Sequence, residues 1–274
     1  MKVVLFCGGL GMRMRVGEDP RPKPMMTIGD RPVLWHIMRY YAHFGHTEFI
    51  LCLGYGAQVV KDYFLHYEET ASNDFVLSDG GRAIDLVSTD ISDWRITFAD
   101  TGLHTEIGER LRRVRKYLDG DELFLAHYGD VLTDAPMNDL VGTFKGSDAA
   151  ASLLAIRPPG SFHVVQIEDG SGLVSGFQPA TDLPLRINGG FFVLRQDIFD
   201  YLNEGDDLVG HGLVRAARQR RVLAIPYDGF WQPMDTLKER ANLEQLYLSG
   251  TSPWAVWRQP GESETSDAMP LVVS

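Results

Sequence analysis

The sequence predicts an α/β fold with a mostly parallel central sheet and helices on both faces. Short apolar runs alternate with longer segments whose apolar residues recur at helical spacing. The first apolar run, residues 2–6, leads into a glycine loop, a helical pattern follows over 33–44, and a second apolar run covers 48–53. Strands that are apolar along their whole length, with helices between them, indicate a parallel sheet that is buried on both sides.

The individual elements follow from their local patterns. In the first helix Leu34, Ile37 and Met38 fall on one face, and Gly45 supplies a stop. The same criteria predict helices over 57–65, 107–118 and 137–144, and strands over 94–99, 122–127 and 149–156. After Pro158 the pattern becomes irregular, with short β-like runs over 164–167 and 173–177 and an Asn-Gly-Gly sequence before the apolar run FFVL. We expect this part to add a less regular region to the same sheet.

The composition indicates a globular protein and argues against several classes of function. The net charge of -11 argues against nonspecific binding of nucleic acid, which depends on basic surface. No apolar run approaches the roughly 18 residues of a membrane span, and the N-terminal run lacks a cleavage site after it. We therefore expect a cytoplasmic protein that binds neither membrane nor nucleic acid. Cys7 and Cys52 lack the spacing of a disulfide framework or a zinc site, so buried free thiols are expected.

The stretch FCGGLGMRMRVGEDPRPKPM, residues 6–25, combines glycines and basic residues directly after the first strand. It is not a P-loop, because no GxxxxGK[ST] run occurs. It is not a dinucleotide fingerprint either, because Met14 stands at the third glycine position and the second strand ends without an acidic residue for a ribose. A nicotinamide-dependent dehydrogenase is therefore excluded.

The residues that remain in this loop suit an anion. Gly8, Gly9 and Gly11 have no Cβ, so their backbone N–H groups can approach phosphate oxygens closely, as in anion-binding nests. Arg13, and Lys23 between two prolines, supply the local positive charge that an acidic chain needs at such a site. An ordinary turn between a strand and a helix is the alternative for the glycines taken alone.

Seven motifs together resemble a known family. The segments GGLGMRMR, RPKPM, IGDRPVLWHIMRYY, LGYG, YGD, INGGFFVL and FWQPMDTL occur in the order found in sugar-1-phosphate nucleotidylyltransferases. The resemblance covers residues 1–257, and LWHIM, INGGFF and FWQPMDT favour the glucose-1-phosphate cytidylyltransferase branch. It implies a Rossmann-like three-layer α/β/α sandwich with a smaller sugar-binding β region. It also implies synthesis of an NDP-sugar and pyrophosphate from an NTP and a sugar 1-phosphate, with Mg²⁺, by a homo-oligomer.

Two carboxylates are candidate metal ligands. Asp130 ends the strand-like run ELFLAHYGD, at the carboxyl edge where open α/β sheets bind ligands, and carboxylates there suit Mg²⁺. Asp235 precedes a helix, so it is equally an N-cap candidate, although Thr236 and Glu239 can form a capping box without it. The resemblance implies that Asp235 is the second magnesium ligand.

The remaining nucleotide-side roles follow from the charge of the reactants. The reaction is attack by a phosphate oxygen on the α-phosphorus of an NTP, so neutralising charge and holding both anions in line matter most. Arg13 and Lys23 are expected to clamp the phosphates as the catalytic residues, and Arg110 matches a family segment that borders the nucleotide. The nucleotide-binding set is therefore Gly8, Gly9, Gly11, Arg13, Lys23, Arg110, Gly129 and Asp130. His36 and His127 have no metal-like partner spacing and are expected to pack in the interior.

The sugar side departs from the family pattern. Asn188 and Gly189 offer an amide and an open backbone to sugar hydroxyls, although Asn is also a common turn residue. Where relatives carry Glu-Lys-Pro, this chain has Pro179-Ala180 after Gln178, so the lysine for the sugar phosphate is missing, and we expect Arg186 to replace it. His163 stands where the pattern PPGxFG has glycine, so we expect its imidazole beside the sugar.

These observations predict one nucleotidyltransferase domain over residues 1–257. Its nucleotide-binding half covers 1–145, its sugar-phosphate-binding half covers 146–257, and a polar tail covers 258–274. CTP and glucose 1-phosphate are the favoured substrates. The open alternatives are the same chemistry with UTP, dTTP or GTP and another sugar 1-phosphate, or a regulatory module that binds sugar nucleotides without turnover.

Overall fold

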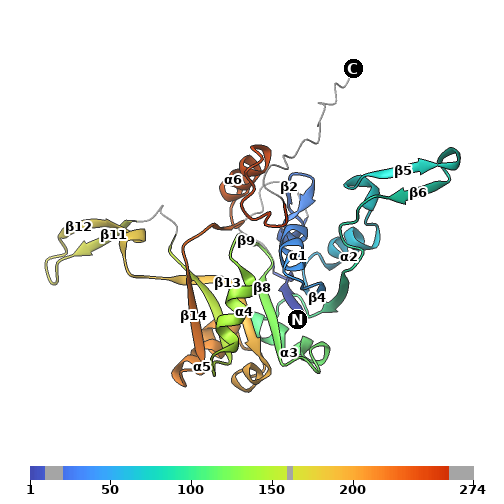
Figure 1. Ribbon diagram of the computed structural model, residues 1–274. Helices are drawn as coiled ribbons and strands as arrows, with labels where there is room; N and C mark the ends of the chain where they lie inside the picture. Colours follow the sequence, from blue (N-terminus) through green and yellow to red (C-terminus); the bar gives the residue numbers. More distant parts are fainter. Residues whose placement is uncertain (10–20, 159–162, 259–274) are drawn as a thin grey trace.

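The fold is a seven-stranded sheet between two layers of helices (Figure 1). The computed structural model describes residues 1–9, 21–158 and 163–258. The sheet has the order β14-β10-β13-β8-β1-β4-β7. Its strands are β1 (Val3–Phe6), β4 (Glu48–Leu53), β7 (Arg95–Asp100), β8 (Leu123–Tyr128), β10 (Ala151–Ile156), β13 (Ile187–Arg195) and β14 (Val222–Tyr227).

Strand direction confirms the predicted mostly parallel sheet. β8, β1, β4 and β7 pair in parallel, as do β10 and β14, whereas β13 runs antiparallel to both of its neighbours. The carboxyl ends of β1 and β8 therefore meet at one edge of the sheet, and both lead into segments that carry predicted site residues. The sheet takes strands from both predicted halves of the chain.

Alternate residues of each strand enter two hydrophobic cores, one on each face of the sheet. Val3 and Leu5 of β1 point into one core, and Val4 and Phe6 into the other. The helices over these cores are α1 (Val33–His43), α2 (Ala57–Leu65), α3 (Ile107–Val114), α4 (Met137–Lys145), α5 (Val214–Arg218) and α6 (Leu237–Leu248). This arrangement confirms the three-layer sandwich.

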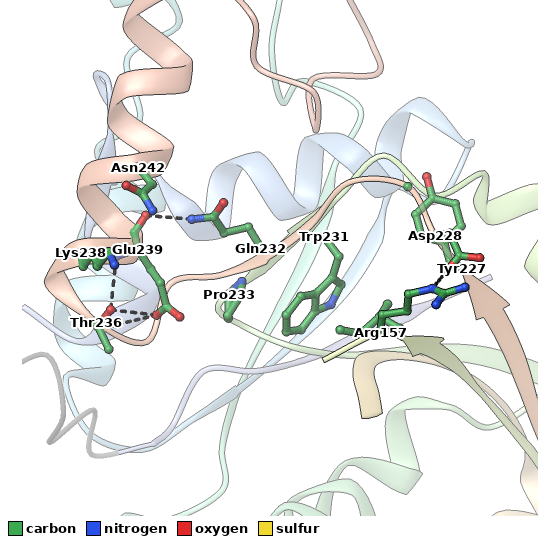
Figure 2. A pocket seen from close by; sticks show the side chains of 12 residues that line it. Arg157, Tyr227, Asp228, Trp231, Gln232, Pro233, Thr236, Lys238, Glu239 and Asn242 are labelled. Atoms are coloured by element: carbon green, nitrogen blue, oxygen red, sulfur yellow. Dashed lines mark hydrogen bonds and ion pairs between the residues drawn. The ribbon is translucent and has the colours of Figure 1, made fainter. Parts of the chain in front are cut away.

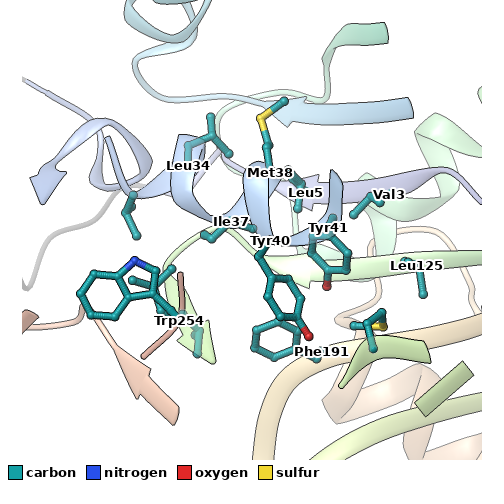
Figure 3. Packing of buried hydrophobic residues seen from close by; sticks show 14 of the residues in the cluster. Val3, Leu5, Leu34, Ile37, Met38, Tyr40, Tyr41, Leu125, Phe191 and Trp254 are labelled. Carbon is teal, nitrogen blue, oxygen red and sulfur yellow. The ribbon is translucent and has the colours of Figure 1, made fainter. Parts of the chain in front are cut away.

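Helix α1 shows why the apolar spacing predicted a helix correctly. Leu34, Ile37, Met38 and Tyr41 are fully buried against β1 and its neighbours (Figure 3). The predicted helix over 107–118 is shorter, because α3 ends at Val114 and a 3-10 turn follows over Arg115–Tyr117. None of the helices in the described part of the chain is long and apolar enough to span a membrane.

The two histidines and two cysteines that the sequence analysis assigned to the interior are buried. His127 is fully buried, with its ring 4.1 Å from that of Phe191 between centroids. His36 is also buried, and Cys7 and Cys52 are buried free thiols. The expectation that these four side chains belong to the interior is confirmed.

In the described residues, four small two-stranded sheets lie outside the main sheet. They pair β2 (Thr27–Ile28) with β3 (Arg31–Pro32), β5 (Phe75–Ser78) with β6 (Ala83–Leu86), β9 (Val131–Thr133) with β15 (Trp231–Pro233), and β11 (His163–Ile167) with β12 (Val174–Pro179). The β-like runs predicted over 164–167 and 173–177 are therefore strands, but they form a separate hairpin instead of joining the main sheet.

Candidate active site

Three predicted residues from distant parts of the sequence meet at the carboxyl edge of the sheet. Lys23 opens a 3-10 turn over Lys23–Met25, Asp130 follows β8, and Asp235 follows β15. The Lys23 ammonium lies 2.5 Å from Oδ2 of Asp130 and also forms an ion pair with Oδ1 of Asp235. Lys23 is separated from these partners by 107 and 212 positions, so the fold alone brings them together.

Backbone pairing explains how the two carboxylates converge. After β8 the chain turns back as β9, which pairs antiparallel with β15, so that Val131 lies opposite Pro233. The Met234 N–H donates a hydrogen bond of 2.8 Å to the carbonyl oxygen of Asp130. Asp130 and Asp235 are therefore held on adjacent stretches of backbone.

The helix after Asp235 has its own cap. The Thr236 hydroxyl accepts from the Glu239 N–H, and the Glu239 carboxylate accepts from the Thr236 N–H, which is a complete capping box for α6. The N–H of Asp235 also donates to Glu239, at 2.8 Å. The carboxylate of Asp235 is thus not used as the N-cap, and it faces Lys23 instead.

The electrostatics of this cluster favour a bound cation. Burial disfavours the charged form of Lys23, but the Asp130 and Asp235 carboxylates outweigh it and raise the lysine pKa. Burial raises the pKa of Asp130, with a further contribution from Asp235, against the lowering effect of Lys23. Two carboxylates thus converge on one cation, the Lys23 ammonium.

The same two carboxylates fit a magnesium ion. Mg²⁺ is usually held by one or two carboxylates, with phosphate oxygens and water completing its shell. The described residues contain no group of three His, Cys, Asp or Glu side chains that could hold a metal by themselves. Asp130 and Asp235 match the smaller protein contribution that magnesium needs when a phosphate substrate is bound.

Gly8 lies in a tight space formed by Arg110 and the chain after β4. A Cβ on Gly8 would lie 2.2 Å from Nη1 of Arg110 and 2.9 Å from the backbone nitrogen of Gly54, so only glycine fits. Next to it, a Cβ on Gly9 would meet nothing within 4 Å in the described part of the chain. Gly129 is also close-packed, because its Cβ would lie 3.0 Å from the carbonyl oxygen of Phe6.

Arg110 supports this loop from within the protein. Its guanidinium is buried and donates to the carbonyl oxygens of Gly8 and Leu53, at 3.1 and 3.2 Å, and to the Thr101 hydroxyl at 2.7 Å. The charge of Arg110 is therefore placed behind the glycine loop, with its hydrogen bonds directed at the protein. Gly11 and Arg13 lie outside the described residues.

On the sugar side, Asn188 and Gly189 form part of a fixed network. The Asn188 amide donates to the Tyr128 hydroxyl at 3.1 Å, and its Oδ1 accepts from the Gly190 N–H at 2.9 Å. The Trp231 indole N–H donates to the carbonyl oxygen of Gly189 at 2.8 Å. This network connects β13 to the strands that carry Asp130 and Asp235.

Arg186, the residue expected to bind the sugar phosphate, shares a carboxylate with a second arginine. Its guanidinium donates to the carbonyl oxygens of Ala155 and Tyr227, at 3.1 and 2.8 Å, and to Asp228 at 3.1 Å. Arg157 also donates to Asp228, at 2.9 Å. The hydrogen bonds from the two arginines lower the pKa of Asp228.

A cleft of about 400 Å³ runs between Arg157 and the start of α6 (Figure 2), and Arg186 is not part of its lining. Its lining includes Arg157 and Asp228 at one end, Trp231 in the middle, and Thr236 and Lys238 at the other end. Thr236 is the neighbour of Asp235, so the cleft ends beside the carboxylate cluster.

Sequence reasoning missed three of the residues that line this cleft. Trp231 belongs to the quoted motif FWQPMDTL, which was the available signal, but no role was assigned to it. Arg157 and Lys238 carry no comparable signal, because only the pairing of β10 with β14 and the direction of α6 bring them here. His163 is exposed at the start of β11, opposite Pro179, and so lies at the base of the β11–β12 hairpin.

Comparison with known proteins finds relatives that share one name. No protein-family model matches the chain. Glucose-1-phosphate cytidylyltransferase of Salmonella typhi is 38% identical over 260 residues, which cover 94% of this chain and 100% of that protein. The enzyme of the same name from Salmonella typhimurium has the same identity and coverage.

Solved structures agree on the fold. HddC from Yersinia pseudotuberculosis superposes with a TM-score of 0.64 at 17% sequence identity, covering 90% of this chain and 99% of that one. A UDP-glucose pyrophosphorylase in complex with UDP-glucose superposes with a TM-score of 0.65 at 17% identity, covering 90% of this chain and 98% of that one, so the Rossmann-like α/β fold is shared.

Proposed function

Because the chain belongs to the glucose-1-phosphate cytidylyltransferase family of sugar-1-phosphate nucleotidylyltransferases, we propose that it converts CTP and glucose 1-phosphate to CDP-glucose and pyrophosphate. It is a nucleotidyltransferase that uses an NTP and a sugar 1-phosphate. The observation that carries the proposed mechanism is the convergence of Lys23, Asp130 and Asp235 at the carboxyl edge of the sheet.

The reaction is a displacement at phosphorus. A phosphate oxygen of the sugar 1-phosphate forms a bond to the α-phosphorus of CTP, and the bond from that phosphorus to the β-phosphate oxygen breaks. Pyrophosphate leaves with the bonding electron pair, and no side chain has to form a covalent bond. The protein contributes charge neutralisation and alignment of two anions.

The site residues can supply both charge neutralisation and alignment. Asp130 and Asp235 would hold Mg²⁺, which would neutralise phosphate charge when bound. Lys23, kept positively charged by these carboxylates, stabilises the charge that develops on the phosphates. We assign Arg13 to the same task. Gly8, Gly9, Gly11 and Gly129 give the nucleotide access to the backbone, and Arg110 holds the loop at Gly8 from behind.

The sugar 1-phosphate binds on the side of the site that contains the cleft. Asn188, Gly189 and His163 are the proposed sugar contacts, and Arg186 is the proposed phosphate contact. The shared carboxylate of Asp228 orients Arg186 and Arg157 together. We further propose that the enzyme is a cytoplasmic homo-oligomer.

The substrate assignment is tested by pyrophosphate release with the four common NTPs and a panel of sugar 1-phosphates, with and without Mg²⁺. CTP with glucose 1-phosphate should give the highest kcat/KM, and omission of Mg²⁺ should abolish release. A higher kcat/KM for another pair would replace the proposed substrates. Binding of sugar nucleotides without turnover for any pair would identify a regulatory module instead.

A further inference from the structure

Glu239, in the first turn of α6, hydrogen-bonds to the backbone at Asp235. Its Oε2 accepts from the N–H groups of Asp235 and Thr236, both at 2.8 Å, and from the Thr236 hydroxyl at 3.1 Å. Figure 2 shows the Glu239 carboxylate turned back toward Thr236. A capping box needs only the bond to the N-cap residue, which is Thr236. The bond to Asp235 is additional, and it holds the backbone from which the Asp235 carboxylate projects.

The backbone on the other side of Asp235 is held as well. The Met234 N–H donates to the carbonyl oxygen of Asp130 at 2.8 Å. Gln232, two residues before Met234 on β15, donates from its side-chain amide to the carbonyl oxygen of Glu239 at 3.3 Å. Asp235 thus lies between two fixed points of the backbone, Asp130 on one side and Glu239 on the other.

Helix α6 is itself attached to the segment that carries Lys23. The Arg240 guanidinium donates to the carbonyl oxygen of Thr27 at 3.1 Å and to the Thr27 hydroxyl at 3.4 Å. Thr27 comes two residues after Met25, where the turn that Lys23 opens comes to its end. The helix that holds Asp235 is therefore also fixed to the segment of its ion-pair partner.

Asp235 depends on such support more than the other members of the charge cluster. Its side chain is 41% exposed, against 25% for Asp130 and 13% for Lys23, so packing restrains it least. Groups that act on a reacting substrate must be held within about 0.5 Å of the productive geometry. Residues that hold a metal-binding carboxylate in place typically contribute about 10- to 100-fold in metal affinity or activity.

We propose that Glu239 is a positioning residue for the reaction, which sets the place of Asp235 relative to Asp130 and Lys23 through the backbone. The proposal rests on the proposed role of Asp235 in holding Mg²⁺. Glu239 also lines the cleft, so direct contact with the sugar 1-phosphate is the alternative. The three hydrogen bonds that its Oε2 accepts favour the positioning role.

The first experiment measures backbone hydrogen exchange by mass spectrometry, without substrate or metal. Glu239→Ala removes the acceptor, Glu239→Gln keeps an acceptor oxygen, and Ala241→Gly weakens the same helix at an exposed position without removing these bonds. We expect the amides of Asp235 and Thr236 to exchange at least about tenfold faster in Glu239→Ala, because hydrogen bonds to charged groups are stronger than neutral ones. The other two variants should stay close to the wild type. Wild-type exchange in Glu239→Ala, or equally fast exchange in Ala241→Gly, would overturn the proposal.

The second experiment measures pyrophosphate release while Mg²⁺ and each substrate are varied in turn. Glu239→Ala should raise the Mg²⁺ concentration that gives half the maximal rate by about 10- to 100-fold, with little change in the KM for glucose 1-phosphate. Glu239→Gln should recover most of this loss, and Ala241→Gly should match the wild type.

Two kinetic results would contradict the positioning role. A raised KM for glucose 1-phosphate with unchanged Mg²⁺ dependence would place Glu239 at the substrate. Equal impairment of Glu239→Gln and Glu239→Ala would show that the charge matters and the hydrogen bonds do not. A wild type that releases no pyrophosphate would refute the proposed function, and the exchange experiment then decides separately whether Glu239 holds Asp235.

Discussion

Lys23 joins two carboxylates that come from different strands, and this contact determines what the site can do. Asp130 and Asp235 repel each other, and a cation between them removes that repulsion. In the proposed reaction these two carboxylates would hold Mg²⁺, which would supply further positive charge, and Lys23 would donate to phosphate oxygens. The proposed role of the cluster is therefore to supply charge, and it requires no nucleophilic side chain.

Replacing Lys23 should impair the chemical step. We expect Lys23→Met to lower kcat for pyrophosphate release by about 10²–10³, the loss typical of removing one preorganised group that stabilises transition-state charge. Lys116→Met, at an exposed position on the other side of the sheet, is the matched control and should keep wild-type kcat. A kcat for Lys23→Met within about twofold of the wild type would show that the ammonium does not act on the reacting phosphates.

Removing Arg186 should weaken the binding of the sugar 1-phosphate more than the binding of the nucleotide. Charge-assisted hydrogen bonds to phosphate are about twice as strong as neutral ones, so Arg186→Ala should raise the KM for the sugar 1-phosphate by about tenfold or more, with little change for CTP. The control is Arg218→Ala, at an exposed position on α5. Steady-state kinetics with each substrate varied in turn gives both constants. An unchanged apparent affinity for the sugar 1-phosphate would remove Arg186 from the site.

At the scale of elements, α1 is joined to the C-terminal part of the chain through His36. The Trp254 indole N–H donates to Nδ1 of His36 at 3.3 Å, so Nε2 carries the proton and donates to the carbonyl oxygen of Ile28 at 3.1 Å. Both ring nitrogens are used only when the imidazole is neutral. Burial accordingly lowers the pKa of His36 to about 4.

This histidine should make stability depend on pH in acid. The unfolded chain binds a proton near pH 6.5, whereas folded His36 resists it until about pH 4, so the free energy of unfolding falls as pH drops through this interval. Urea unfolding of the wild type should therefore show a slope steeper than that of His36→Asn by about 1.4 kcal/mol per pH unit. The exposed His66, replaced by Asn, serves as control and should keep the wild-type slope. Parallel curves for the wild type and His36→Asn would contradict the assignment.

The elements that sequence predicted well are those with a local signal. β1, α1 and β4 each contain a periodic apolar pattern, and the capping box of α6 was readable from Thr236 and Glu239. The pairing of β9 with β15 could not be predicted, because it depends on a contact between segments about a hundred residues apart in sequence. The separation of the β11–β12 hairpin from the main sheet was also missed, because the apolar runs over 164–167 and 173–177 do not show which strands they pair with.

The candidate site was also only partly predictable, because it too depends on contacts between distant segments. Residue chemistry identified Lys23, Asp130 and Asp235 individually, but it left Asp235 balanced between a cap and a metal ligand. The fold gives the cap to Thr236 and turns Asp235 toward Lys23, whereas the metal-ligand role of Asp235 stays a proposal. Arg157 could not be found, because its place in the cleft depends on Asp228 in a loop 71 positions away.

On the scale of the whole molecule, the candidate site lies at the carboxyl edge of the central sheet of an acidic chain. Lys23 and Arg110 bring positive charge to the carboxyl ends of the central strands, where the carboxylates of Asp130 and Asp235 also lie. The seven-stranded sheet fixes the relative position of the nucleotide and sugar sides, since both contribute strands to it.

The central claim is that Asp130 and Asp235 support nucleotidyl transfer from CTP to glucose 1-phosphate. The most direct measurement is ³¹P NMR of the products formed by the wild type, Asp130→Asn and Asp235→Asn with both substrates and Mg²⁺, with Asp139→Asn as a control on the exposed surface of α4. The account predicts CDP-glucose and pyrophosphate from the wild type and the control, and a loss of at least about 10²-fold in rate for both site variants. Unchanged rates in either site variant, or substrates that remain unreacted with the wild type, would contradict it.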